Sequence, residues 1–467
     1  MIASFRSYGF VSHGLGFSRT RSSGARGSSG RVLQMWALLA VAATAVGCAD
    51  VATAPSASSG PACPSFVPAS TGLPQDGEWR THPSVADVNG DGLGDIAALP
   101  RKAPGAHVYL SDGLGGWSDS SEGLAYATSF SCGIGTRLTD VNLDGKVDLV
   151  IADHCDGLRV YHGDGEGRWT ERSRGIPRNM AGFNDAAVGD LDQDGWPDIV
   201  AIAAFSSGFL VMRGRPAGDW EWVQDTGLPK VGSGFEIELY DVNGDGLLDI
   251  VSSFVPATIE KRDPVPPPAK VWLQGPPLRF RPADGFPEGG RYYGLAVIPH
   301  ADRGPDLLFA LIGHQAGIHR FEATEDGWTS VGRIDEAAFG PKPRGFIGLH
   351  AADLNADGCQ DLMTVSADTR MVWVAMGDCA GHWEFCPEDT LPIDDPVVGW
   401  GVTTGDVNGD GMLDVVAGFG WKQRGSVKAW IQTQKHGSAV SSASLAPGAA
   451  PGEPNPPSPQ AFDARTR

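Results

Sequence analysis

Six acidic segments hold the residues of this chain that could do chemistry. Each follows the pattern Asp-x-Asn/Asp-x-Asp-Gly-x-x-Asp, and most copies begin about 50 residues after the previous one. Oxygen side chains at positions 1, 3, 5 and 9, a glycine at position 6 for the sharp turn and a free backbone carbonyl at position 7 can converge on one hard cation. Calcium prefers such all-oxygen sites. The predicted metal ligands are Asp87, Asn89, Asp91 and Asp95; Asp140, Asn142, Asp144 and Asp148; Asp190, Asp192, Asp194 and Asp198; Asp241, Asn243, Asp245 and Asp249; Asp353, Asn355, Asp357 and Asp361; and Asp406, Asn408, Asp410 and Asp414. We therefore predict Ca²⁺ as the cofactor, at about six sites, one for each segment.

A short aliphatic run follows each acidic segment, as at residues 198–202. The segment lacks the glutamate that an EF-hand loop carries at position 12, and no long amphipathic helix flanks it. Short apolar runs bounded by glycine turns are typical of buried strands. A single copy could be an ordinary solvated acidic turn, but six copies in register with the same glycine and the same following strand indicate a true repeat. The cation is therefore expected at a β-hairpin.

Each repeat holds four predicted strands in about 50 residues, and the fourth strand opens with an aromatic residue such as Trp169 or Trp220. This arrangement is typical of the blade of a β-propeller. A seventh unit lies in the one doubled interval. There residues 298–306 keep carboxylates only at positions 5 and 9, so we expect a blade without calcium. The last unit lacks a fourth strand, which residues 66–74 can supply. The predicted fold is all-β, a seven-bladed β-propeller of four-stranded blades, closed by an N-terminal strand that completes the last blade.

These acidic loops and their blades resemble the FG-GAP/VCBS repeats, the calcium-binding blades of integrin α-subunit heads and of many exported bacterial proteins. The resemblance covers about 370 residues, from 65 to 434. It implies that the acidic loops join the first and second strands of each blade on one face, where they act as structural staples. It also implies that ligands meet the opposite face.

The turns predicted for that opposite face are rich in Trp, Tyr, Phe and Arg, the residue types enriched at recognition hot spots. The candidate ligand-binding residues are Trp79, Arg80, Arg291, Tyr292, Tyr293, Arg344, Trp400, Trp421 and Arg424. The same turns contain His82, Asp185 and Glu236. The alternative interpretation is that some of the aromatic residues pack between blades and that the arginines are ordinary surface residues.

Residues 1–47 have the features of a secretory signal: five arginines without an acidic residue, an apolar run, and small residues ahead of Cys48. Cys48 resembles the lipid-modified cysteine of bacterial lipoproteins, with simple secretion as the alternative. Residues 48–64 are predicted to be a flexible tether, residues 65–434 the propeller, and residues 435–467 a disordered tail rich in Pro, Ala and Ser. The predicted localisation is an exported lipoprotein of the outer membrane or cell surface, otherwise a periplasmic or secreted protein.

The six cysteines other than Cys48 could form three disulfides in an exported protein. The predicted pairs are Cys132 with Cys155, Cys379 with Cys386, and Cys63 with Cys359. The first pair is expected on adjacent strands of one repeat and the second across a hairpin turn. The third pair is what remains.

The formal net charge of −20 argues against a nucleic-acid partner, because that binding needs basic patches. The sequence has no nucleophile elbow, His-Glu-x-x-His helix or Walker-type loop, and the acidic pairs are metal ligands, so no catalytic residue is predicted. We expect a monomeric, non-enzymatic recognition or adhesion module for a protein or glycan, which meets a membrane only through a lipid anchor. Two alternatives stay open: a carbohydrate-active enzyme similar to polysaccharide lyases, with a site at the channel mouth, or a scaffold in an outer-membrane assembly.

Overall fold

The computed structural model describes residues 62–433. Stretches inside this range that are not described are residues 104, 126–130, 179–181, 205–206, 217, 256–269, 288–290, 302, 325–326, 340–343, 368, 395–396 and 423. The predicted signal, Cys48, most of the tether and the C-terminal tail lie outside the described residues. Their assignments therefore stay predictions.

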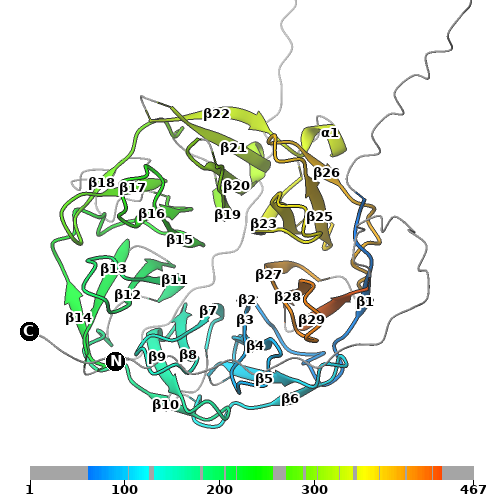
Figure 1. Ribbon diagram of the computed structural model, residues 1–467, viewed down its shortest axis with the longest axis horizontal. Helices are drawn as coiled ribbons and strands as arrows, with labels where there is room; N and C mark the ends of the chain where they lie inside the picture. The colour runs from blue at the N-terminus through cyan, green and yellow to red at the C-terminus, as the bar shows by residue number, and fades with distance from the viewer. Residues whose placement is uncertain are drawn as a thin grey trace, which may run out of the picture. The chain divides into compact units, whose positions relative to one another are not determined.

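Within the described residues the strands form seven antiparallel sheets, arranged as blades around a common axis (Figure 1). Blade 1 contains β3 (Ser84–Ala86), β4 (Asp95–Ala98), β5 (His107–Ser111) and β6 (Trp117–Asp119); blade 2 contains β7 (Ile134–Thr139), β8 (Asp148–Asp153), β9 (Gly157–Gly163) and β10 (Trp169–Glu171); blade 3 contains β11 (Phe183–Gly189), β12 (Asp198–Ala203), β13 (Phe209–Gly214) and β14 (Trp220–Val223). Blade 4 contains β15 (Ile237–Tyr240), β16 (Asp249–Ser252), β17 (Val271–Gln274) and β18 (Phe280–Pro282); blade 5 contains β19 (Arg291–Ile298), β20 (Asp306–Ile312), β21 (Gly317–Thr324) and β22 (Gly327–Arg333). Blade 6 contains β23 (Phe346–Ala352), β24 (Asp361–Ser366), β25 (Val372–Gly377) and β26 (Trp383–Phe385); blade 7 contains β27 (Gly399–Gly405), β28 (Asp414–Trp421), β29 (Arg424–Gln432) and β1 (Phe66–Pro68). The predicted all-β propeller of seven blades is confirmed.

The N-terminal strand closes the ring, as the sequence predicts. β1 pairs antiparallel with β29, with Phe66 opposite Gln432, and so supplies the fourth strand of blade 7. Just beyond this pairing the Thr433 amide donates to the Ser65 carbonyl at 2.9 Å. Joining the two ends of the repeat array in one sheet pairs the strand edge that an open array would expose.

One strand pairing was not predicted. Pro83 interrupts the first strand of blade 1, because proline has no amide hydrogen to donate to a sheet. The residues before it form the short β2 (Thr81–His82), which lies parallel to β7 and adds a fifth strand to the sheet of blade 2. The innermost strands of two neighbouring blades are therefore linked directly by backbone hydrogen bonds.

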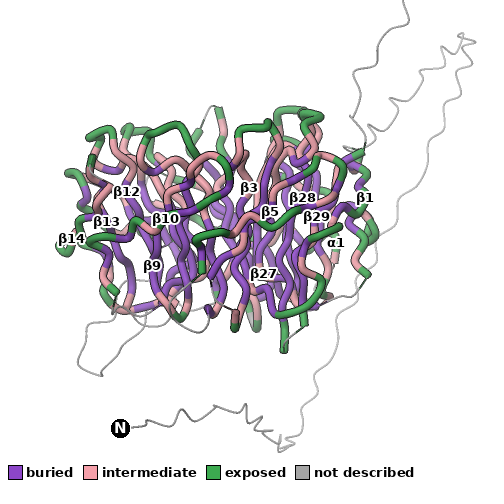
Figure 2. Tube along the Cα trace, turned by 90° about the horizontal axis from the view of Figure 1, so that it is seen from below, coloured by how far each residue is buried: buried purple, intermediate pink, exposed green. Residues whose placement is uncertain are grey.

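The core lies between neighbouring blades, where apolar side chains of facing sheets interlock. Ile250 and Trp272 of blade 4 pack against Val200 and Val211 of blade 3, and none of the four is more than 1% exposed. Each such side chain contributes roughly 1.5–3 kcal/mol through burial. Figure 2 shows the consequence: buried residues fill the middle of the ring, and exposed residues gather in the loops of its two faces. Functional side chains must therefore come from these loops or from the innermost strands.

In blades 2 and 3 the tryptophan that opens the fourth strand crosslinks the blade to its predecessor, whereas in blade 6 Trp383 donates to the Gln360 carbonyl of its own blade. Trp169 donates from Nε1 to the Ser120 carbonyl at 2.9 Å, and Trp220 donates to the Arg172 carbonyl at 3.1 Å. Both tryptophans are 5% exposed. A buried indole N–H needs an acceptor, and here the preceding blade supplies it. In blades 2 and 3 the repeated aromatic position of the sequence is thus a contact between blades.

Helix is confined to two short pieces in the described part of the chain. They are the 3₁₀ turn η1 (Gly313–Gln315), between β20 and β21 of blade 5, and α1 (Glu336–Phe339), whose Phe339 packs against blade 6. Among the described residues, none of the helices has the length and apolar character needed to cross a membrane.

The disulfides correct two of the three predicted pairs. Cys132 with Cys155 is confirmed. The other two bonds join Cys63 to Cys386 and Cys359 to Cys379, so the predicted pairs Cys379 with Cys386 and Cys63 with Cys359 are wrong. The reason is ring closure, which carries the segment before β1 to the seam between blades 6 and 7. There Cys386 packs in the same core cluster as Phe66. Cys379, in the turn before β26, instead forms its disulfide with Cys359 of the adjacent acidic loop.

Candidate functional site

Each acidic loop folds around the carboxylate at its first position. In the first loop Asp87 accepts on Oδ1 the backbone N–H groups of Gly90 (2.7 Å) and Asp91 (3.1 Å), and on Oδ2 that of Gly92 (2.9 Å). The bond from the position-6 glycine recurs in all six loops at 2.8–3.0 Å. Gly92 has a φ of 86°, a conformation that glycine adopts without the strain of a side chain. The loops join first and second strands, as predicted.

The aspartate at position 9 anchors each loop to its blade. Asp95 is fully buried, accepts the Val88 N–H on Oδ2 (2.9 Å) and accepts the Ser111 N–H of the third strand on Oδ1 (2.9 Å). Burial raises the pKa of Asp95 to about 6, and the nearby carboxylates of Asp91 and Asp87 add to the shift. A cation in the loop would relieve this accumulation of negative charge.

The third loop brings its carboxylates closest together. Oxygens of Asp190, Asp192 and Asp194 all lie within 4.8 Å of one another, and these residues are the one such group of three in the described part of the chain. Arg213 of β13 forms ion pairs with Asp192 and with Asp194 (2.9 Å to the latter). An oxygen-only donor set with this density of charge fits a hard divalent ion such as Ca²⁺. The side chains at positions 1, 3, 5 and 9 would hold it in each loop.

In blade 5 arginine side chains lie where the acidic loops of the other blades would hold a cation. Asp306, at position 9 of the degenerate loop, is fully buried and accepts hydrogen bonds from Arg303 Nη1 (2.5 Å) and Arg320 Nε (2.8 Å), while His300 Nε2 lies 3.0 Å away. Burial opposes ionisation, but the hydrogen bonds of Arg303 and His300 and the charge of Arg320 hold the pKa of Asp306 below its usual value. This arrangement supports the prediction of a blade without calcium.

The predicted aromatic residues gather most closely where blade 7 meets blade 1. The Arg80 guanidinium lies 4.7 Å from the ring centre of Trp400 and 5.0 Å from that of Trp421. We call Arg80, Trp400 and Trp421 the Arg80 cluster. Trp421 is 43% exposed and stands opposite Arg424 in the hairpin between β28 and β29, at the end of the strands remote from the acidic loop. The cluster therefore lies on the face opposite the acidic loops, where ligand-binding residues were predicted.

Trp79 does not join that surface. It is 6% exposed and packs edge-on against His107 and Tyr109 of β5. Its side chain belongs to the contact between blades 7 and 1, which is the alternative that the sequence left open for such aromatics.

The remaining candidates form two further groups around the ring. At the start of β19, Arg291 is exposed, Tyr293 stacks on Phe235 at 3.9 Å, and Tyr292 is 2% exposed with Lys270 Nζ 3.8 Å from its ring centre. At blade 6, the Arg344 guanidinium lies 4.5 Å from the ring of Phe339 and 5.7 Å from that of Trp373. The nine candidates therefore do not form one site.

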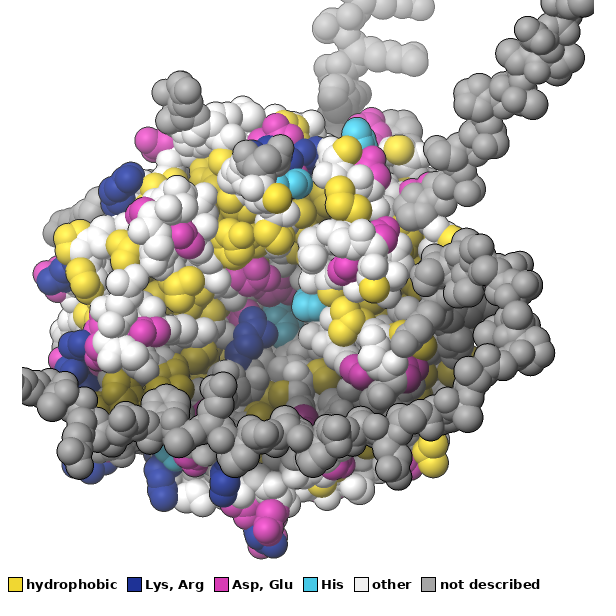
Figure 3. Space-filling model, in the orientation of Figure 1, with side chains coloured by type: hydrophobic (Ala, Val, Ile, Leu, Met, Phe, Trp, Pro, Cys, Tyr) yellow, Lys and Arg dark blue, Asp and Glu magenta, His cyan; other side chains and the backbone are white. Residues whose placement is uncertain are grey.

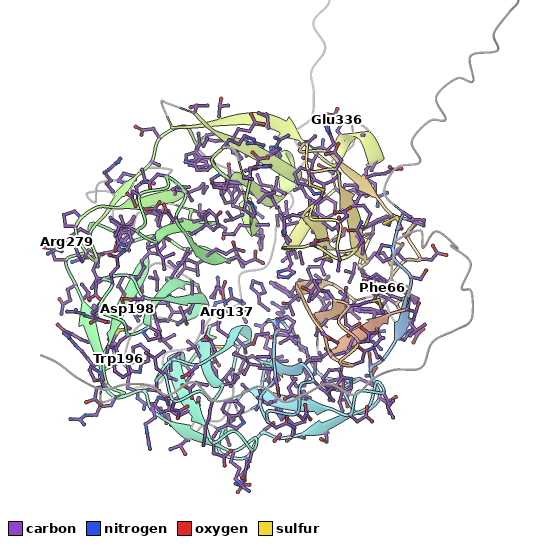
Figure 4. All side chains as sticks on the ribbon, in the orientation of Figure 1. Phe66, Arg137, Trp196, Asp198, Arg279 and Glu336 are labelled. Atoms are coloured by element: carbon purple, nitrogen blue, oxygen red, sulfur yellow. A yellow bond between two sulfur atoms is a disulfide. The ribbon has the colours of Figure 1, made fainter. Side chains whose placement is uncertain are left out.

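A charged cluster at the centre of the ring was not predicted as a unit. First strands line the ring axis, and alternate residues point into it. Counting back from the first aspartate of each acidic loop, positions −5 and −3 supply these side chains. We call the following residues the channel cluster: His82, Arg137, Asp185, Glu236, Glu238 and His350. Five of them line a cavity of about 410 Å³, and Asp185 lies behind Arg137. Figure 3 shows acidic, basic and histidine side chains in the central hollow, and Figure 4 shows Arg137 pointing toward the axis.

Charge is unevenly compensated in this cluster. Arg137 Nη2 donates to Asp185 at 2.9 Å, and Glu236 Oε2 accepts the Leu295 N–H at 2.6 Å. Burial raises the pKa of Glu238 to about 7 and that of Glu236 well above its usual value.

Both histidines of the channel cluster are neutral at physiological pH. Burial, with the charge of Arg137, lowers the pKa of His82 to about 3 and that of His350 to about 4. His82, Asp185 and Glu236 were expected among the turns, whereas Arg137, Glu238 and His350 were not predicted. A polar residue three positions before five of the six acidic loops could have revealed them.

Comparison with known proteins identifies the repeat. The FG-GAP-like repeat family matches residues 140–201 and 353–417. Chicken (Gallus gallus) integrin alpha-6 is 28% identical over 159 residues, which is 28% of this chain and 14% of the integrin. Human integrin alpha-6 is 30% identical over 149 residues, 28% of this chain and 13% of the integrin. The chain thus spans only a small part of the curated relatives that it matches.

A solved structure shares the fold. The crystal structure described as BBS1N in complex with ARL6DN, soaked with lead, superposes with a TM-score of 0.50 at 10% sequence identity, covering 80% of this chain and 98% of the other. At that identity the likeness concerns the propeller fold alone.

Proposed function

This chain is a seven-bladed propeller built from FG-GAP-like repeats, and from that premise we propose that it is an exported, calcium-stabilised module that recognises a protein or a glycan. The Arg80 cluster carries the proposal. A guanidinium held beside two indoles on an exposed face combines the residue types that dominate recognition hot spots. The integrin likeness supports an adhesive or recognition role but leaves the ligand open.

Calcium has a structural role in this proposal. The six loops lie on the face opposite the Arg80 cluster, and each joins a first to a second strand. Binding of Ca²⁺ to the folded loops would stabilise the propeller by mass action, about 2.7 kcal/mol per site at a hundred times the dissociation constant. The ion would then hold the recognition surface rigid without touching the ligand.

An oxidising compartment fits the three disulfides of the described residues. Together with the predicted signal at residues 1–47, they support export. Attachment through a lipid at Cys48 is part of the proposal, and it would tether the propeller to a membrane surface while leaving the recognition face free.

The test compares two tryptophans of matched exposure. Trp421, in the Arg80 cluster, is 43% exposed, and Trp222, on the outer strand β14, is 40% exposed. Wild type and the variants Trp421→Ala and Trp222→Ala are applied with calcium to a glycan array and to an envelope-protein pull-down with quantitative mass spectrometry.

We expect Trp421→Ala to lose at least tenfold in binding of a shared glycan or protein, since hot-spot truncations cost about 2 kcal/mol or more. Trp222→Ala should bind like wild type. Equal binding by all three proteins, or loss in Trp222→Ala alone, would refute the assignment of the recognition surface. A glycan hit and a protein hit distinguish the two ligand classes.

A further inference from the structure

The central cavity has the size and lining of a ligand site. Its volume of about 410 Å³ falls in the range of roughly 300–1,000 Å³ typical of small-molecule pockets. Its lining residues come from blades 1, 2, 3, 4, 6 and 7 and include Arg137, Glu236, Glu238 and two histidines. Residues from so many blades meet only at the axis, so the whole ring holds their positions.

Carboxyl groups outnumber cationic side chains around this cavity. One guanidinium, that of Arg137, faces the carboxyl groups of Asp185, Glu236 and Glu238, and it already donates to Asp185. The two neutral histidines add no positive charge, because burial keeps their pKa values near 3 and 4. A cationic guest would supply hydrogen-bond donors and positive charge to these carboxyl groups.

One buried oxygen of the channel cluster lacks a hydrogen-bond partner among the described residues, and a second oxygen, on a residue of the cavity lining, lies beyond hydrogen-bond range of the nearby histidine. Asp185 is fully buried, and its Oδ1 accepts no hydrogen bond there. Glu236 lines the cavity at 9% exposure, and its Oε1 lies 3.7 Å from His82 Nε2, beyond hydrogen-bond range. Glu236 lines the cavity and Asp185 does not, so the carboxyl group of Glu236 is the one that a donor inside the cavity can reach.

We propose that the channel cluster binds a small organic cation, an alkylammonium group of an aliphatic amine or diamine, between Glu236 and Glu238. An ammonium group offers three N–H donors with a positive charge, which matches the surplus of carboxylate acceptors. A metal ion fits less well. In the described residues the carboxylates that approach one another as metal ligands do are Asp190, Asp192 and Asp194, not those of the channel. The inference is independent of the proposed recognition function.

The experiment titrates the exported chain with 1,4-diaminobutane by isothermal calorimetry in saturating Ca²⁺, so that the acidic loops are filled. The uncharged analogue 1,4-butanediol serves as the ligand control. The variants are Glu238→Gln and Glu236→Gln, with Glu384→Gln as a matched control, since Glu384 is an exposed glutamate of β26. Melting curves verify that each variant is folded, and two variants keep the test decisive if one does not fold.

We expect the diamine to bind and the diol not to bind. Each channel variant should lose at least tenfold in affinity, while Glu384→Gln should keep wild-type affinity. Binding at pH 7 should also release protons, measured from buffers of different ionisation enthalpy, because the cation favours the carboxylate form of Glu238. That release should be smaller in Glu238→Gln and in Glu236→Gln than in wild type, because burial raises the pKa of both carboxyl groups.

Three results would overturn the proposal. The first is failure of the wild-type protein to bind the diamine. The second is equal affinity in wild type and both channel variants, which would place any bound amine elsewhere. The third is displacement of the diamine by further Ca²⁺, which would make the cavity a metal site.

Discussion

The disulfide between Cys63 and Cys386 should contribute more stability than either of the other two. It joins residues 323 positions apart, and it ties the segment before β1 to blade 6 across the closure of the ring. The bond between Cys359 and Cys379 spans only 20 positions, within one blade. Both restrict the unfolded chain, but the longer loop removes more of its conformational freedom.

The chain-entropy relation gives the expected magnitudes. A loop of 323 residues corresponds to about 6 kcal/mol at 25 °C, and a loop of 20 residues to about 3 kcal/mol. The other two disulfides lie inside the large loop and shorten it only slightly. Removing the closing bond should therefore cost roughly 2–3 kcal/mol more than removing the local one.

The assay is equilibrium unfolding in urea with saturating Ca²⁺, followed by tryptophan fluorescence and far-ultraviolet circular dichroism. Coincidence of the two transitions is the check on two-state behaviour. The closing pair and the local pair are each replaced by alanine. The pair Cys132 and Cys155, 23 positions apart, provides a second short loop. Because Cys386 is 3% exposed, the single variant Cys63→Ala separates loss of the bond from loss of packing at Cys386.

Equal destabilisation by the closing and local pairs, or a smaller effect of the closing pair, would refute the reasoning. It would mean that the strand pairing of β1 with β29 already restricts the chain without the disulfide.

Three further predictions concern the cations and the channel. A calcium chelator should lower the melting temperature markedly, since each occupied loop stabilises the folded state; an unchanged melting curve in excess chelator contradicts the calcium assignment. Arg303→Ala should lower the free energy of unfolding by about 1.5–3 kcal/mol whether or not calcium is present, because it removes charged hydrogen bonds to the buried carboxylate of Asp306. Arg168→Ala, which removes exposed surface ion pairs, should have a smaller effect; a calcium-dependent loss in Arg303→Ala would contradict the role of arginine in blade 5. Glu238→Gln should raise the melting temperature at pH 8 and leave it unchanged near pH 4. The folded protein keeps a proton on Glu238 up to a pKa of about 7, whereas the unfolded chain releases it near 4.5, so wild type loses stability as the pH rises from 4.5 to 7. A rise in melting temperature at pH 4 equal to the rise at pH 8 would contradict this prediction.

Local features of the fold could be predicted from the sequence. The position-6 glycine and the recurring aspartates specify a hairpin loop in which the first carboxylate accepts hydrogen bonds from backbone groups a few residues ahead. The aliphatic run after each loop specifies a buried strand. The missing fourth strand of the last unit and the spare strand at residues 66–74 together required ring closure. These inferences succeeded because each rests on short-range geometry repeated in register.

Two of the three cysteine pairs and the channel cluster could not be predicted from such local patterns. Cys379 and Cys386 are close in sequence, yet Cys386 faces the seam that closure creates, where Cys63 arrives from the other end of the propeller. Arg137 and Glu238 occupy strand positions that could equally have faced solvent. Only the assembled ring brings these side chains to one axis.

The sequence by itself determined the repeat, the oxygen-rich loops, the number of blades and the strand that completes the last one, because each follows from a short local pattern that recurs in register along the chain. The tertiary structure decided which cysteines meet, which aromatic residues are exposed, and which charges share the central cavity. Those outcomes depend on distances between blades, and these distances exist only after the two ends of the propeller have paired in one sheet.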